Sequence, residues 1–135
     1  MIDTNNTLLY IHTKKISAIK ILIEALKEIF RDVNIKFTPK VEKQYDNDTK
    51  TKIVGGMSIM ALNSNGNILI RLQLDADKFC EYYCNPMLDN KQYILLGINM
   101  SNLYKIIKVL NNDDELYLMY DKHNLNQLHL QYINE

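Results

Sequence analysis

The spacing of apolar residues constrains the fold of this chain more than any other feature, because one segment has the period of a helix and a later one has the period of a strand. Residues 16–30 place apolar side chains at spacings of 3, 4, 3 and 4, which is the period of a helix with one buried stripe. Residues 68–74 repeat apolar side chains at every second position, as a half-buried strand does. The predicted elements follow the order strand, helix and further strands, and the same order occurs again later in the chain. We therefore predict a single α+β domain over residues 1–135, with a long antiparallel sheet, two helices and a weak duplication of βαβββ type.

The bounds of the expected elements follow from these periods and from the residues that interrupt them. We predict helices at residues 14–31 and 99–112. Pro39 is expected to end a strand, and the polar residues 40–52 to form an exposed hairpin tip or a disordered loop. Residues 63–67 are a strong turn signal. The candidate helix caps are Thr13 or Ser17 and Asn99 or Ser101. The predicted strands are residues 8–12, 33–38, 53–62, 68–74, 79–84, 93–98, 116–120 and 128–132.

Positive charge is concentrated on the two predicted helices, although the formal net charge of the chain is zero. Residues 14–31 have a net charge of +3, residues 99–112 have +2, and the rest of the chain has −5. At about 100° per residue, the basic residues Lys20, Lys27 and Arg31 fall within an arc of roughly 40° beside the apolar stripe. Lys105 and Lys108 point away from the stripe of the second helix. This separation indicates a face for a polyanion, although lysines that only solvate two surface helices would give the same pattern.

The motifs of common enzymes are absent from the sequence. It has no glycine-rich phosphate loop, no nucleophile elbow and no HExxH motif or carboxylate cluster, so we predict no catalytic residue, no metal and no cofactor. A small enzyme with an unusual site is the weakest alternative. Cys80 and Cys84 are interpreted as reduced structural residues in preference to redox or metal ligands. Because no apolar run approaches the roughly 20 residues of a membrane helix, we expect no membrane partner.

Three segments together resemble the sliding clamps of DNA replication, of the proliferating cell nuclear antigen type. Residues 22–29 (LIEALKEI) resemble the first DNA-facing helix of that family. Residues 79–85 (FCEYYCN) contain its pattern of Phe, two residues, Tyr, one residue and Cys. Residues 96–108 (LGINMSNLYKIIK) resemble its segment G-[VI]-N-L-x-S-[ML]-x-K-I-L-K nearly position for position. The segments occur in family order, and the resemblance spans residues 8–133.

The chain also departs from the clamp pattern. Clamps usually carry a Met-Asp-Ser-Ser-His-Val run in a turn that helps to form the pocket for partner peptides, and residues 62–67 read LNSNGN instead. Of the residues in this turn, we expect only Leu62 and Ser64 to have the partner-binding role that the resemblance implies. Residues 39–52 form an inserted polar loop relative to common clamps. A clamp subunit resembles two such domains, so we expect this chain to be the N-terminal half of a subunit, shortened or encoded by a split gene.

The resemblance implies a ring that encircles duplex DNA without sequence specificity and tethers DNA polymerase and other clamp-binding peptides, in replication and repair. It implies a homotrimer for the full-length protein, whereas this domain alone would be a monomer or a non-ring species. A cellular clamp would be nuclear, and a viral clamp would lie in the nucleus or at a cytoplasmic replication site of the host. The alternative is a clamp-fold scaffold, or a transcription or checkpoint factor, that does not slide. The expected DNA-binding residues are Lys15, Lys20, Lys27, Arg31, Lys105 and Lys108.

Overall fold

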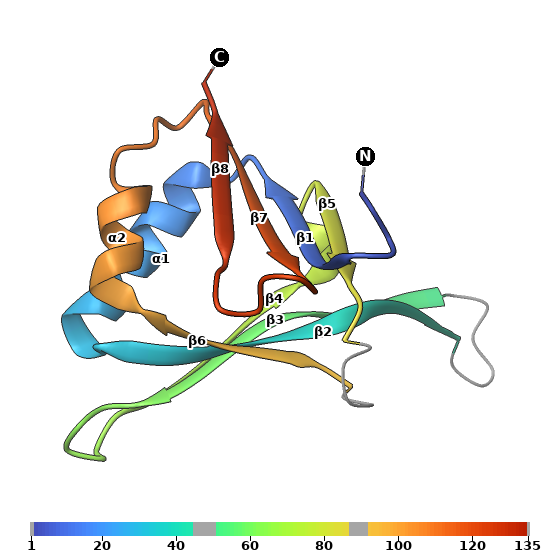
Figure 1. Ribbon diagram of the computed structural model, residues 1–135. Helices are drawn as coiled ribbons and strands as arrows, with labels where there is room; N and C mark the ends of the chain where they lie inside the picture. Colours follow the sequence, from blue (N-terminus) through green and yellow to red (C-terminus); the bar gives the residue numbers. More distant parts are fainter. Residues whose placement is uncertain (1, 45–50, 87–91, 135) are drawn as a thin grey trace.

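Two helices lie side by side next to two antiparallel sheets (Figure 1). The structure is a computed structural model that describes residues 2–44, 51–86 and 92–134. In this part of the chain the elements are β1 (Thr7–Thr13), α1 (Ile16–Ile29), β2 (Asp32–Gln44), β3 (Thr51–Leu62), β4 (Leu69–Asp75), the 3-10 helix η1 (Ala76–Lys78), β5 (Glu81–Cys84), β6 (Ile94–Asn99), α2 (Met100–Ile107), β7 (Glu115–Asp121) and β8 (His129–Ile133).

The strands form one sheet of order β5-β1-β7-β8 and another of order β4-β3-β2-β6. Each helix leads the chain from one sheet to the other, because α1 joins β1 to β2 and α2 joins β6 to β7. The strand before each helix pairs with the strand after the other helix, so that β1 pairs with β7 and β6 pairs with β2. The predicted α+β class is therefore confirmed, and in the described chain the two runs share a strand–helix–strand–strand order, with two strands instead of three after α2. The strands divide between two sheets instead of forming one long sheet, because both crossovers change sheets.

The hydrophobic core lies between the two sheets and the helices. Leu9 on β1, Phe37 on β2 and Ile59 on β3 are almost completely buried there, and Leu26 of α1 packs on them. The inward side chains of the strands and the stripe of α1 thus share one core, as the two periodicities require. A second cluster joins both helices to β7 and consists of Ile16, Ile107, Leu110 and Leu116.

Pro39 does not end β2, which corrects the prediction from sequence. β2 continues to Gln44, and its register with β3 shifts between Thr38 and Val41. Two residues, Pro39 and Lys40, oppose the single residue Gly55 at this bulge. Proline is tolerated there because its missing N–H is not needed by the regular ladder. Strand structure thus extends into the predicted loop 40–52 from both sides, and residues 45–50 lie outside the described residues.

Other boundaries differ by a few residues. The turn at residues 63–67 is confirmed, and the side-chain oxygen of Asn63 accepts hydrogen bonds from the backbone N–H groups of Asn67 and Ile68, both at 3.0 Å. The strand predicted at 79–84 is present only as β5, because η1 precedes it. The helix predicted at 99–112 ends at Ile107, because the chain then turns to bury Leu110 in the second cluster.

Candidate nucleic-acid interface

The start of α2 is fixed by three hydrogen bonds, two of which reach the segment that follows α1. Asn99 is the N-cap, and its Oδ1 accepts from the backbone N–H of Asn102 at 3.0 Å. The Nδ2 of Asn99 donates to Oδ1 of Asp32 at 3.2 Å, and the backbone N–H of Met100 donates to the carbonyl oxygen of Arg31 at 2.9 Å. Asn99 therefore caps α2, as predicted, and also joins it to the segment that follows α1.

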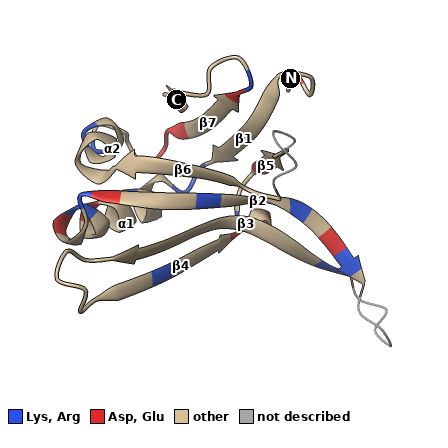
Figure 2. Ribbon diagram, turned by 60° about the horizontal axis from the view of Figure 1, so that its bottom comes forward, with Lys and Arg blue, Asp and Glu red and all other residues tan. Residues whose placement is uncertain are grey.

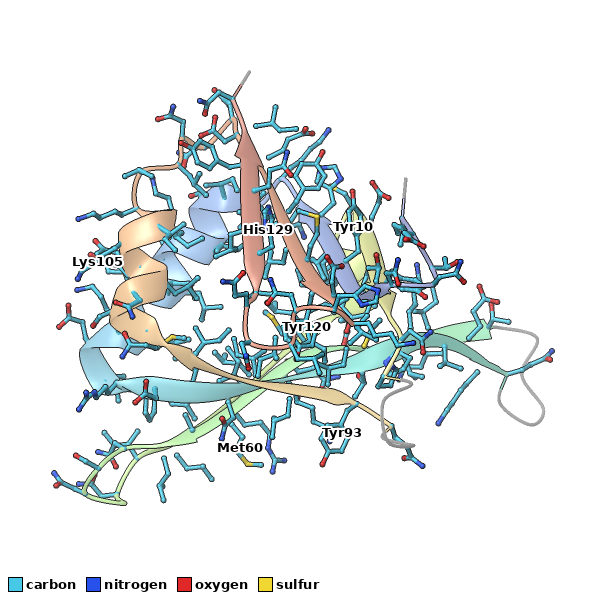
Figure 3. All side chains as sticks on the ribbon, viewed as in Figure 1. Tyr10, Met60, Tyr93, Lys105, Tyr120 and His129 are labelled. Atoms are coloured by element: carbon cyan, nitrogen blue, oxygen red, sulfur yellow. The ribbon has the colours of Figure 1, made fainter. Side chains whose placement is uncertain are left out.

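The two candidate residues of α2 face solvent. Lys105 lies in the last turn of the helix and Lys108 is its C-cap, and both side chains are exposed. Lys105 points outward from α2 in Figure 3. Basic groups are favourable at this end of a helix because of the partial negative charge of its free carbonyl groups. Since α2 contains no acidic residue, its exposed charge has one sign.

The candidate residues of α1 that flank its apolar stripe hold the two helices together. The Nζ of Lys20 donates to the carbonyl oxygen of Leu110, directly after α2. The Nζ of Lys27 lies 4.5 Å from the ring centre of Tyr104 on α2 and 2.8 Å from Oε1 of Glu28. The hydrogen bond between Lys27 and Glu28 raises the pKa of Lys27 and lowers the pKa of Glu28. Both lysines are half-buried, so they contribute to helix packing as well as to surface charge.

Acidic side chains partly offset the positive charge of α1. Figure 2 shows basic and acidic residues together on this helix, where Glu24 and Glu28 are exposed. The remaining two candidates flank α1 at opposite ends, about 24 Å apart at the helical rise of 1.5 Å per residue. Lys15 is the exposed N-cap residue, and the Nε of Arg31 lies 3.9 Å from Oδ2 of Asp32. The structure thus places all six basic candidates on the two helices or at their ends, with the clearest positive surface on α2.

The two candidate partner-binding residues lie apart from these basic residues. Leu62 ends β3 with its side chain 59% exposed, and Ser64 is exposed in the following turn. Leu62 pairs across the hairpin with Leu69, which is also exposed. Figure 1 shows this turn at the free end of the β3–β4 hairpin, away from α2. The structure therefore presents a small apolar pair at the turn and a separate basic surface at the helices.

One contact residue of the helix pair was not identified from the sequence. The ring of Tyr104 lies against the ammonium group of Lys27. The spacing of apolar residues in α2 does not indicate this contact. Lys14 was counted in the charge but not as a candidate, and its Nζ lies 3.1 Å from Oε1 of Glu115. This hydrogen bond contributes to lowering the pKa of Glu115. Only the pairing of distant segments could have revealed either contact.

The cysteines form no disulfide and belong to no metal site in the described chain. Cys80 and Cys84 are both free thiols. Within residues 2–44, 51–86 and 92–134, no group of three or more His, Cys, Asp or Glu side chains could hold a metal ion. None of the helices in these ranges combines the length and apolarity needed to cross a membrane.

Known proteins with similar sequences are clamp proteins. A probable DNA polymerase sliding clamp of Paramecium bursaria Chlorella virus 1 is 29% identical over 128 residues, which cover 95% of this chain and 41% of that protein. The probable DNA polymerase sliding clamp of Acanthamoeba polyphaga mimivirus is 23% identical over 152 residues, covering 97% of this chain and 32% of that protein. The chain therefore spans less than half the length of these relatives.

Solved structures with the same fold agree with the sequence comparison. The Entamoeba histolytica proliferating cellular nuclear antigen superimposes with a TM-score of 0.68 at 22% identity, covering 95% of this chain and 47% of that one. A PCNA2-PCNA3 complex from Sulfolobus tokodaii also gives a TM-score of 0.68, at 17% identity. The family model described as the N-terminal domain of proliferating cell nuclear antigen matches residues 8–135. Since that match covers nearly the whole sequence, the chain belongs to the proliferating cell nuclear antigen family and corresponds to its N-terminal domain.

Proposed function

We propose that this chain is the N-terminal domain of a DNA sliding clamp, a ring component that surrounds duplex DNA and holds a polymerase on it. The observation that carries the proposal is the match of residues 8–135 to the N-terminal clamp domain, together with the exposed lysines of α2. The proposed role is mechanical, so we assign no chemical step to any side chain.

The geometry of the helices suits a protein that must hold DNA and still slide. Lys105 and Lys108 are long, exposed cations that can attract phosphates without fixing one position on the duplex. Phosphate contacts give no sequence information, so such a surface does not stop on a particular base pair. We assign the main DNA contact to these two lysines. Lys20 and Lys27 support it by holding α1 against α2, and Lys15 and Arg31 extend the basic surface to the two ends of α1.

The remaining parts of the proposal concern the whole protein. We propose that the full-length subunit assembles into a homotrimeric ring, and that clamp-binding peptides of a polymerase contact the turn that contains Leu62 and Ser64. Support for these partners comes from the names of the viral relatives and from the exposed position of this turn. The proposal of a homotrimer rests on the resemblance to the clamp family.

The test is polymerase processivity on a primed template, measured with and without the full-length protein. We expect longer products with the protein present. The double variant K105E/K108E should shorten them, because charge reversal repels the phosphates that the lysines attract. Lys122→Glu is the matched control, since Lys122 is exposed near the β7–β8 turn, away from both helices, and it should leave the product length unchanged.

Two outcomes would contradict the sliding role. If the full-length protein gives no stimulation with any polymerase of the same source, the clamp-fold scaffold becomes the better interpretation. If K105E/K108E weakens binding to one DNA sequence and spares others, the lysines would read bases instead of following the phosphate backbone.

A further inference from the structure

The sheet β4-β3-β2-β6 has a hollow on the face turned away from the helices. Its volume is about 410 Å³. Met60 and Tyr93 lie on this face in Figure 3, on the opposite side of the sheet from α1 and α2. We call this hollow the outer groove, and its lining residues include Asn34, Lys36, Ser58, Met60, Arg71 and Leu95.

The strand register builds the outer groove from adjacent side chains. Leu95 of β6 pairs with Lys36 of β2, and Lys36 pairs on its other side with Ser58 of β3. Ser58 pairs in turn with Gln73 of β4, and in the adjacent row Met60 of β3 pairs with Arg71 of β4. Directly paired residues of antiparallel strands place their side chains on the same face and within contact distance. A continuous row of side chains therefore crosses all four strands.

The outer groove contains two cations that lack an acidic partner in the described chain. The Nζ of Lys36 lies 4.5 Å from the ring centre of Tyr93, and Nη2 of Arg71 donates to the sulfur of Met60 at 3.6 Å. Neither side chain forms an ion pair with any residue in the ranges that the structure describes. Arginine has five N–H donors in a planar arrangement that matches a carboxylate, and one weak sulfur contact leaves most of them available.

The carboxylates on the same face, Asp32 and Asp75, lie outside the groove lining and accept hydrogen bonds from amide side chains. Oδ1 of Asp75 accepts from Nε2 of Gln73 at 3.2 Å. At the other end of the face, Oδ1 of Asp32 accepts from Nδ2 of Asn99, also at 3.2 Å. No carboxylate is among the groove's lining residues. The outer groove is therefore a local positive site on a chain whose formal net charge is zero.

Exposed apolar side chains stand beside both cations. Met60 is 55% exposed next to Arg71, and Leu95 is 54% exposed next to Lys36. Methionine adapts its shape to different partners because its side chain is unbranched and polarisable. A cation beside an exposed apolar group suits a ligand that presents a carboxylate beside an apolar side chain.

We infer that the outer groove binds an extended acidic peptide segment of a partner protein in which an apolar residue and an Asp or Glu stand two positions apart. A peptide fits better than duplex DNA, because the groove lining contains only two cations and the side chains beside them, Met60 and Leu95, are apolar. A strand-like peptide has the required spacing, since residues two positions apart lie on the same face. This inference does not depend on the proposed DNA contact, which uses the opposite side of the molecule.

The experiment titrates this chain into a fluorescein-labelled peptide of repeated Asp-Ser-Leu-Ser, which places Asp and Leu on the same face of an extended chain, and follows fluorescence anisotropy. We expect saturable binding that weakens as salt is added, and no binding of a matched peptide of repeated Lys-Ser-Leu-Ser. The variant K36E/R71E should weaken binding by about tenfold or more, because it places two like charges against the peptide. Met60→Ser should weaken binding by about threefold to tenfold through loss of apolar contact. Arg71→Lys keeps the charge and should have a smaller effect than K36E/R71E.

Lys40→Glu is the matched control, because Lys40 is an exposed residue of the same strand within the bulge and does not line the groove. It should bind the peptide as the unchanged chain does. The inference is overturned if K36E/R71E binds as tightly as the Lys40→Glu control, or if both peptides bind equally. It is also overturned if K36E/R71E lowers affinity for duplex DNA while peptide binding is absent, because the groove would then be a nucleic-acid surface. The processivity of K105E/K108E tests the DNA role separately.

Discussion

The Nζ of Lys20, on α1, donates a hydrogen bond to the backbone carbonyl oxygen of Leu110, just beyond α2. Leu110 is itself buried with Ile16 of α1, so the polar contact and the apolar contact join the same two segments. The carbonyl group of Leu110 lies in the turn that follows α2, outside the hydrogen bonds of the helix, and Lys20 of the neighbouring helix supplies its donor. Lys20 therefore has a structural role that its place in a basic arc did not indicate.

Replacing Lys20 by methionine should lower the free energy of unfolding. Methionine keeps most of the apolar stem, so the loss reports mainly the hydrogen bond from the ammonium group, about 1–2 kcal/mol. Urea denaturation followed by circular dichroism measures the difference. Lys105→Met is the matched control on an exposed helical position, and it should change stability by less than about 0.5 kcal/mol. Equal effects of the two variants would show that the Lys20 contact does not stabilise the helix pair.

The lysines of α2 should determine how DNA binding by the full-length protein depends on salt. Each lysine that neutralises one phosphate contributes about 0.9 to the slope of log affinity against log salt concentration. K105Q/K108Q should therefore flatten this slope by up to about two, equally for duplexes of different sequence. Fluorescence anisotropy over a series of potassium chloride concentrations measures the slope. An unchanged slope would place the phosphate contacts on other residues.

The bulge in β2 should depend on a glycine opposite Pro39. Gly55 has a φ of +99°, and a Cβ on it would lie 2.0 Å from the carbonyl oxygen of Pro39. Gly55→Ala should destabilise the chain by about 3 kcal/mol or more, because the backbone itself must move. Gly66→Ala is the control: Gly66 has a φ of +73°, but a Cβ there meets no atom within 4 Å. It should cost only about 1 kcal/mol. Similar urea midpoints for both variants would contradict the clash.

Much of this fold could be predicted from the sequence, because the spacing of apolar residues indicates which side chains face the core. The stripe that includes Ile23 and Leu26 is buried as predicted, and Asn99 caps α2 with the expected hydrogen bond. The division into two sheets could not be predicted, since periodicity gives the inward face of a strand but not its neighbour. The continuation of β2 past Pro39 depends on a glycine in another strand, so residues 33–44 alone could not indicate it.

The basic residues of the candidate interface could be predicted from the sequence, but the role of each residue could not. Lys105 and Lys20 were both predicted from the sequence to be DNA-binding residues. Only the pairing of α1 with α2 separates them, because it leaves Lys105 in solvent and directs Lys20 to the carbonyl group of Leu110. The outer groove has the same origin: Lys36 and Arg71 are far apart in the chain and meet through the register of β2, β3 and β4.

The buried thiol of Cys84 should make the chain less stable at alkaline pH. Its side chain lies against the carbonyl oxygen of Phe37 at 3.6 Å, and burial raises the pKa of Cys84 to about 12 from its usual value of 9.0. The folded chain keeps this proton while the unfolded chain releases it, so the unfolded state binds fewer protons above pH 9. The contribution of the thiol is therefore complete below about pH 9 and declines by up to about 1.4 kcal/mol per pH unit toward pH 12.

Urea denaturation of the unchanged chain and of Cys84→Ala, at a series of pH values from about 8 to 10.5, measures this effect. The alanine variant should be less stable near pH 8, where it has lost the packing of the sulfur, and the difference between the two proteins should shrink as pH rises. Burial also raises the pKa of Tyr82, whose hydroxyl donates to the carbonyl oxygens of Thr38 and Gly56 at 2.7 and 2.9 Å, so some alkaline loss should remain in the variant. Cys80→Ala removes an exposed thiol and should follow the unchanged chain at every pH. Parallel loss of stability in the unchanged chain and in Cys84→Ala would show that Cys84 ionises as readily in the folded chain as in the unfolded one.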